Sequence, residues 1–212
     1  MDPAASEEVK DIMEVENAGE GKQYQILDAA ARMFASYGFN KTNMGDVVRE
    51  AGVARATLYK YYSSKDALFH AVVSREGSQM LDAVSEAVSA ATSTRERLRL
   101  AIITHTDLIR QKLNVLRVSL EAAAHIMSRW RHETDELQEK ALDFYAGIIE
   151  RGVESEEIES DDPRETALLL MYMMKGLFLG VLTGQVGAER DRLVDGMLDV
   201  VLDGLRPRGE VA

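Results

Sequence analysis

The 212-residue sequence predicts an all-α fold, and three observations support this. Proline, which helix interiors tolerate least, occurs only 3 times. The good helix formers Ala, Leu, Glu, Arg and Met are plentiful. Apolar residues recur three and four positions apart along most of the chain, which places them on one face of a helix. We expect about nine helices on this spacing.

The chain begins with an acidic segment, and a first helix follows it. Residues 1–21 carry seven acidic side chains and one lysine, which predicts a solvated tail. The helix is expected from about Lys22 to Tyr37, since Ile26 and Phe34 belong to an apolar set at helical spacing. Gly38 stands where a helix-ending glycine is expected.

Two short helices joined by a tight turn are predicted next. The first covers Met44 to Ala51, and Asn43 with Asp46 has the spacing of a capping box at its start. Gly52 suits a turn that needs a left-handed backbone. The second covers Arg55 to Tyr61 or to the residue after it. Two such helices with glycine in the turn form the helix-turn-helix of DNA-reading proteins.

The second short helix has distinct inner and outer faces. Leu58 and Tyr62 are four residues apart and are expected to face inward. Thr57, Lys60 and Tyr61 share the outer face. This polar and basic face, with small Ala56 beside it, suits close approach to a DNA groove.

Long helices fill the rest of the chain. Ser63 and Asp66 have capping-box spacing and predict a helix from about Ser64 to Ala90. The Asp162-Pro163 pair is a helix-start signal. The remaining helices are expected near 94–112, 115–131, 133–153, 163–182 and 188–205.

Charge and cysteine content restrict the class of protein. The net charge is -11, but residues 22–75 hold eight basic and four acidic side chains, so a local positive field suits phosphate contact. The absence of cysteine excludes disulfides, thiol catalysis and thiolate metal sites. No signal peptide and no apolar run of membrane-spanning length is visible. We therefore expect a cytoplasmic protein that does not associate with membranes.

Two consecutive segments resemble the TetR family of transcriptional regulators. They are ILDAAARMFASYGFNKTNM, Ile26 to Met44, and GDVVREAGVARATLYKYYSSKDALF, Gly45 to Phe69. The resemblance implies a homodimeric repressor that binds a palindromic operator in double-stranded DNA and is released by a small-molecule effector, apolar or amphipathic. It implies a DNA-binding domain at 22–66, after the tail at 1–21, and a ligand-binding and dimerisation domain at 67–212.

The resemblance also implies which residues contact DNA. Recognition-helix contacts fall on Arg55, Ala56, Thr57, Tyr59, Lys60 and Tyr61, and flanking, mostly phosphate-side contacts fall on Thr42, Met44 and Lys65. Ala54 stands where the family often has Ser or Thr, which weakens that helix end by about 1 kcal/mol. The tail is acidic where a DNA-binding arm would be basic.

Apolar spacing in the second domain indicates two further surfaces. A ligand pocket between the middle helices would be lined by His105, Ile109, Leu116, Leu120, Trp130, Phe144, Tyr145, Ile148, Met174 and Lys175. A dimer interface on the last two helices would use Leu168, Met171, Tyr172, Leu179, Leu182, Leu193, Met197, Val200 and Val201.

The sequence bears differently on other classes of function. A DNA-binding regulator controlled by a protein partner, or without a ligand, stays open, because a cavity cannot be seen in a sequence. An enzyme is not expected, since no Ser-His-Asp set or Gly-rich phosphate loop can be assembled. Glu121, His125 and His132 could share a helix face, but a break near Arg131 argues against a metal site. No cofactor is expected.

Overall fold

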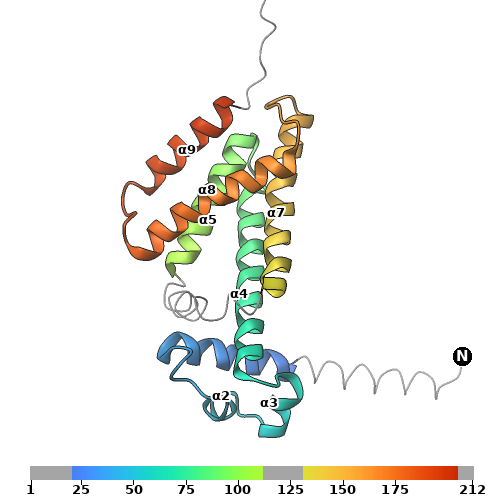
Figure 1. Cartoon of the computed structure of the whole chain (residues 1–212), viewed down its shortest axis with the longest axis vertical. Helices are drawn as coiled ribbons and strands as arrows, with labels where there is room; N and C mark the ends of the chain where they lie inside the picture. The colour runs from blue at the N-terminus through green and yellow to red at the C-terminus, as the bar shows by residue number, and fades with distance from the viewer. Residues whose placement is uncertain (1–20, 112–130, 205–212) are drawn as a thin grey trace, which may run out of the picture. The chain divides into compact units, whose positions relative to one another are not determined.

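The computed structural model describes residues 21–111 and 131–204, which form two compact units (Figure 1). The head unit holds the described residues up to Arg75, and the body unit holds those from Glu76 onward. Eight helices and no strand occur in these stretches, which confirms the all-α prediction. The helix expected at 115–131 lies almost wholly outside the described residues.

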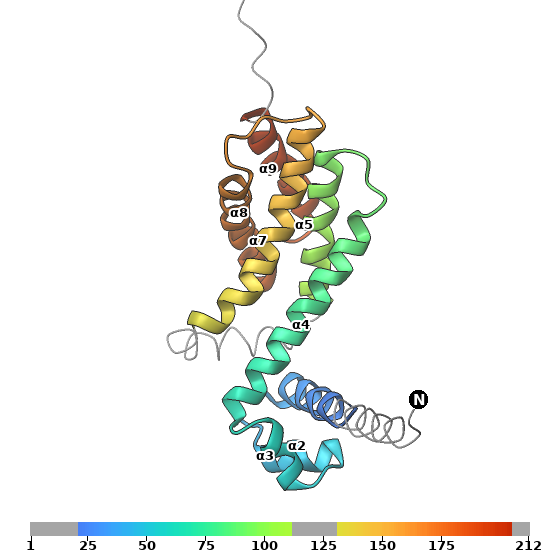
Figure 2. The same ribbon diagram turned by 90° about the vertical axis from the view of Figure 1, so that its right-hand side faces the viewer.

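The head unit consists of a helix at residues 21–37, α2 (Met44–Ala51), α3 (Arg55–Tyr61) and the start of α4 (Lys65–Val88). In both views α2 and α3 lie on the same side of the helix 21–37 (Figure 2). The buried side chains of this unit come from all four helices and include Ile26, Phe34, Val47, Leu58 and Leu68. Inward apolar stripes on short helices therefore build one core, as the spacing predicts.

Sequence-specific caps fix both ends of α2. The Asn43 side chain accepts the Asp46 backbone N–H at 3.0 Å, and the Asp46 carboxylate accepts the Asn43 N–H at 3.1 Å. Gly52 ends the helix with φ 63°, a left-handed conformation in which a side chain would be strained. Both features were expected from the sequence and are confirmed.

The caps of the next two helices differ from that pattern. Ala54 precedes α3 and provides no side-chain cap, as expected. The predicted capping role of Ser63 is wrong by one residue, because the hydroxyl of Ser64 accepts the Ala67 N–H at 3.1 Å and α4 begins at Lys65.

The body unit contains the rest of α4, α5 (Thr94–Gln111), α7 (Arg131–Glu154), α8 (Pro163–Thr183) and α9 (Arg190–Gly204). One continuous core joins these helices, with Val84 from α4, Ile102 from α5, Ile149 from α7, Leu170 from α8 and Leu198 from α9. No helix in the two described stretches is both long and apolar enough to cross a membrane.

The contact between Thr94 and the end of α7 sets the direction of two helices. The Thr94 backbone N–H donates to the Glu157 carboxylate at 2.7 Å, which lowers the pKa of Glu157. A Cβ on Gly152 would come within 2.5 Å of the Thr94 hydroxyl, so this position has no room for a side chain. The start of α5 therefore meets the end of α7, and Figures 1 and 2 show the two helices running antiparallel.

Ion pairs join α5 to α9 along their length. Arg95 pairs with Asp199 at 2.8 Å, and Arg99 pairs with Asp195 at 2.7 Å. Asp191 lies 4.0 Å from Arg99, one turn before Asp195. The acidic residues of α9 thus recur every fourth position along the side that faces α5.

Candidate nucleic-acid interface and effector region

The outer face of α3 is basic and aromatic. Arg55, Ala56, Tyr59 and Lys60 are exposed, while Leu58 has no exposed surface. The helix contains no acidic residue. Thr57 and Tyr61 are half-buried at the edges of this face. The inward orientation of Leu58 and Tyr62 is confirmed, and the exposed face is free to meet a polyanion.

Each cation of α3 lies over a tyrosine ring. The guanidinium carbon of Arg55 is 5.6 Å from the centre of the Tyr59 ring, and Nζ of Lys60 is 5.9 Å from that of Tyr61. Such contacts hold long side chains in fewer conformations. The face therefore presents charges that are partly positioned in advance.

Lys65 binds within the protein. Its ammonium donates to the carbonyl oxygens of Phe39 at 2.9 Å and Thr42 at 3.1 Å. The same Nζ lies 4.2 Å from the centre of the Phe39 ring. An ammonium has three N–H donors, so one remains for another partner. The side chain fastens the turn after the helix 21–37 to the start of α4, which the sequence did not indicate.

Thr42 and Met44, expected to flank the recognition helix, differ in accessibility. Thr42 is only 1% exposed, and its hydroxyl donates to the Gly38 carbonyl at 2.9 Å. In this conformation that hydroxyl has no open side toward a ligand. Met44 is the first residue of α2 and is half-buried.

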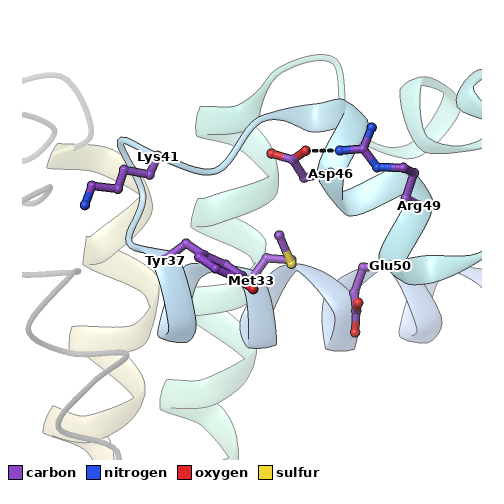
Figure 3. A pocket seen from close by; sticks show the side chains of 6 residues that line it. All are labelled: Met33, Tyr37, Lys41, Asp46, Arg49 and Glu50. Carbon is purple, nitrogen blue, oxygen red and sulfur yellow. Dashed lines mark hydrogen bonds and ion pairs between the residues drawn. The ribbon is translucent and has the colours of Figure 1, made fainter.

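An open depression of about 470 Å³ lies between the helix 21–37 and α2 (Figure 3). Met33 and Tyr37 come from the helix, Lys41 from the turn, and Asp46, Arg49 and Glu50 from α2. Its acids are already paired, Asp46 with Arg49 and Glu50 with Arg32. We therefore assign it no ligand.

The residues expected to line an effector pocket divide into three groups. Tyr145, Ile148 and Met174 are fully buried in the body-unit core, with Phe144 packed against it. Lys175 is exposed, and its ammonium lies 4.4 Å from the centre of the Tyr172 ring. Leu116, Leu120 and Trp130 lie outside the described residues, as does the side chain of Ile109.

Of the residues predicted to line the pocket, two carry a buried polar atom that has no hydrogen-bond partner among the described residues. These atoms are Nδ1 of His105 on α5 and the hydroxyl of Tyr145 on α7. The His105 ring packs against Phe178 of α8, with the ring centres 4.7 Å apart and the planes tilted by 46°, and burial lowers the pKa of His105 to about 4. Burial likewise raises the pKa of Tyr145. Both groups are therefore neutral near pH 7.

The outer faces of α8 and α9 expose large apolar side chains. Exposure is 61% for Leu169, 59% for Tyr172, 54% for Leu179 and 71% for Val200. Of the other residues predicted for a dimer interface, Leu168 and Leu193 are exposed, Met171, Met197 and Val201 are half-buried, and the side chain of Leu182 is not among those described. Leu169 is exposed but was not predicted, because α8 is apolar on all sides and periodicity cannot show which side faces out.

The described residues contain no group of three or more His, Cys, Asp or Glu side chains that could hold a metal ion. Glu121 and His125 lie outside the described residues, as does the His132 side chain.

Family models match both units. The model of bacterial regulatory proteins of the TetR family matches residues 26–72, and that of the tetracyclin repressor-like C-terminal domain matches residues 91–179. The chain is 25% identical over 138 residues to the fatty acid metabolism regulator protein of Bacillus subtilis, covering 65% of this chain and 71% of that one. It is 23% identical to the transcriptional repressor KstR2 of Rhodococcus jostii, covering 87% and 91%.

Solved structures share the fold. FadR of Bacillus subtilis in complex with stearoyl-CoA aligns with a TM-score of 0.66 at 22% identity, covering 86% of this chain and 99% of that one. The flavonoid-responsive regulator FrrA aligns with a TM-score of 0.68 at 25% identity, covering 90% and 100%. Together with the two matched family models and the helix-turn-helix of α2 and α3, these findings show that the chain belongs to the TetR family of bacterial helix-turn-helix transcriptional regulators.

Proposed function

We propose that this protein is a repressor that binds a palindromic operator as a homodimer and leaves it when a small molecule binds the body unit. The observation that carries the DNA-binding part is the outer face of α3, with exposed Arg55 and Lys60 stacked on tyrosines and no acidic residue. A single helix of this kind fits the major groove, where arginine and lysine read guanine.

Within this proposal the residues have separate roles. Arg55, Tyr59, Lys60 and Tyr61 reach base edges and groove walls, Ala56 lets the helix approach closely, and Thr57 lies at the side of the groove. Met44 and the remaining donor of Lys65 lie toward the phosphates. Thr42 supports the turn that positions them, because its hydroxyl is used internally.

A second copy of the chain would cover the apolar faces of α8 and α9. Large exposed apolar surface of this kind is uncommon on a monomer. A Cβ built at Gly176 would meet nothing within 4 Å, so space is open there for close helix approach. Four helices, two from each protomer, would form a bundle, and the twofold symmetry would match a palindrome.

The relatives indicate the chemistry of the effector. One is a fatty acid metabolism regulator, one solved structure holds stearoyl-CoA, and another responds to flavonoids. We therefore favour an apolar or amphipathic effector, consistent with the aliphatic and aromatic core of the body unit. Such a protein would act in the cytoplasm, without catalysis. Control by a protein partner, or without a ligand, is the alternative.

The test is selection of bound duplexes from a random DNA pool with the purified chain near physiological salt. Enrichment of an inverted repeat supports a dimeric operator reader. The selection is repeated after unfolding, dialysis and refolding, which remove any carried-over ligand. If a folded dimer enriches no inverted repeat in either selection, the proposal of a dimeric operator reader is contradicted. The selected operator then serves to screen fatty acyl-CoA thioesters and flavonoids for release; if none releases the DNA, the alternative gains.

A further inference from the structure

Buried polar atoms without partners need a physical reason. Most buried donors and acceptors in proteins are hydrogen-bonded, because an unpaired one has lost its bonds to water. Among the described residues of the body unit, the hydroxyl of Tyr145, Nδ1 of His105 and the hydroxyl of Thr94, the first residue of α5, break this rule. Tyr145 is 1% exposed, so water cannot replace the missing bond from outside. A phenylalanine would fill the same space at position 145 without that cost.

The atoms of Tyr145 and His105 belong to one region of the fold. Ala101 of α5 and Tyr145 of α7 belong to the same core cluster. His105 lies one turn further along α5. Tyr145 shares a core cluster with Met174 of α8, and His105 stacks on Phe178 of the same helix. Both orphan atoms therefore lie among α5, α7 and α8, which pack against one another in the body unit.

The charges of this region decide which polar group would be accepted. Among the described residues the buried cation is Arg190, and its guanidinium already pairs with Asp107 and Asp191. Lys175 is exposed on α8. His105 is uncharged near pH 7, because burial lowers its pKa to about 4. No described group in this core could neutralise a buried carboxylate, whose burial without a partner is very costly.

We propose that Tyr145 and His105 hydrogen-bond an uncharged oxygen of the effector, as in an alcohol, ester, thioester or ketone, while its hydrocarbon part lies among α5, α7 and α8. This rests on the proposed function and names the chemical class of its effector. A phenol and a neutral imidazole can each donate one hydrogen bond to such an oxygen. Met174, a long and adaptable side chain in the same cluster, can change rotamer to admit the chain.

The experiment compares four ligands with one ten-carbon chain, namely 1-decanol, methyl decanoate, decanoate and decylammonium. The two neutral ligands are kept below their solubility limits and the two ions below their micellar concentrations. Isothermal titration calorimetry at pH 7.5 measures binding to the wild-type chain, Tyr145→Phe, His105→Phe and the exposed control Tyr24→Phe. We expect decanol or the methyl ester to bind at least tenfold more tightly than decanoate and decylammonium. Tyr145→Phe should weaken that binding about fivefold or more, and Tyr24→Phe should not change it.

Urea unfolding of the ligand-free variants gives a second readout. If the Tyr145 hydroxyl lacks a partner, Tyr145→Phe unfolds at the same or higher urea concentration than wild type. A clear loss of stability would mean that the hydroxyl is bonded within the protein and would overturn the proposal. Equal or tighter binding of decanoate, an unchanged affinity in Tyr145→Phe, or no binding of either neutral ligand would also overturn it. The selection of operator DNA does not depend on the calorimetry or on the urea measurements. A failure of the effector proposal can therefore be distinguished from a failure of the DNA-binding proposal.

Discussion

The ammonium of Lys65 lies 4.2 Å from the centre of the Phe39 ring and donates to the Phe39 carbonyl at 2.9 Å. The Phe39 ring also packs on the Phe69 ring, with the two centres 4.8 Å apart. Contacts with Lys65 and with Phe69 therefore both hold the turn before α2 in place. Lys65, which the sequence suggests is a surface charge, thus helps to hold the head unit together.

Removal of Lys65 should therefore have two effects. Lys65→Ala loses two hydrogen bonds from a charged donor, and we expect the free energy of unfolding to fall by about 2 kcal/mol. If its third donor also reaches a phosphate, the slope of log K against log salt should flatten by about one unit. Urea titration and DNA binding at several salt concentrations measure these effects. A lower stability with an unchanged slope would limit Lys65 to its structural role.

Arg55→Ala should weaken binding to the selected operator by about 1 to 3 kcal/mol and relax the base preference at one position. The reason is that Arg55 is exposed beside Tyr59 on the α3 face that we propose to read bases. Fluorescence anisotropy with operator and scrambled duplexes measures both affinities. The exposed arginine Arg151 of α7 provides the control variant, Arg151→Ala. Equal losses on the two duplexes would place Arg55 on the backbone instead.

Ala54→Ser should raise the free energy of unfolding by about 1 kcal/mol, because a serine hydroxyl at this extended position can accept a free N–H of the first turn of α3. Ala56→Ser, inside the helix, is the matched control and should be neutral or slightly destabilising. Urea denaturation compares the three proteins. No gain at position 54 would show that the first turn of α3 is already satisfied by solvent.

Tyr172→Asp should weaken dimerisation by about 2 kcal/mol or more, roughly thirtyfold, because it places a carboxylate in the apolar face of α8. Sedimentation velocity over a concentration series measures the monomer–dimer equilibrium. Tyr24→Asp changes a tyrosine of similar exposure in the head unit and should leave that equilibrium unchanged. A dimer of wild-type strength in Tyr172→Asp would exclude this face as the interface.

His105 should make the protein less stable in mild acid. Its pKa is about 4 in the folded chain against 6.5 as a free side chain, so between these values the unfolded state binds a proton that the folded state does not. The stability is complete above pH 6.5 and falls by about 3 kcal/mol as the pH approaches 4. His105→Phe removes this contribution. We expect the unfolding free energy of His105→Phe, taken relative to its own value at pH 8, to vary less with pH between 6.5 and 4 than that of the wild type. If the two proteins gave parallel curves of unfolding free energy against pH, His105 would be accessible to protons in the folded state.

Local signals predicted the elements of the head unit well. Asn43 with Asp46 and the left-handed Gly52 fix α2 and the turn after it, and each acts within a few residues of its partner. The roles of Lys65 and Thr42 were not predicted, because they depend on where the turn after Gly38 lies against α4. Lys65 contacts residues 23 and 26 positions away in the chain, and no periodicity reports such a contact.

In the body unit, too, the sequence predicted the local elements better than the contacts between them. Its helix boundaries were predicted to within two or three residues by apolar spacing and by signals such as Pro163, which lies in the first turn of α8. The apolar side of α8 that faces solvent was not fully predicted, since Leu169 was missed, because apolar residues surround that helix. Nor could the orphan hydroxyl of Tyr145 be foreseen, since a missing bond is visible only once every neighbour is in place.

The spacing of the acids on α9 has a mechanical consequence. Arg95 and Arg99 on one helix and Asp191, Asp195 and Asp199 on the other both repeat every four residues. A slide of α9 by four residues, about 6 Å at 1.5 Å per residue, would exchange the partners and restore both pairs, with Arg99 moving to Asp191. A slide by half a turn would leave the charges between partners. The ion pairs therefore favour two registers of α9 against α5, four residues apart, over the positions between them.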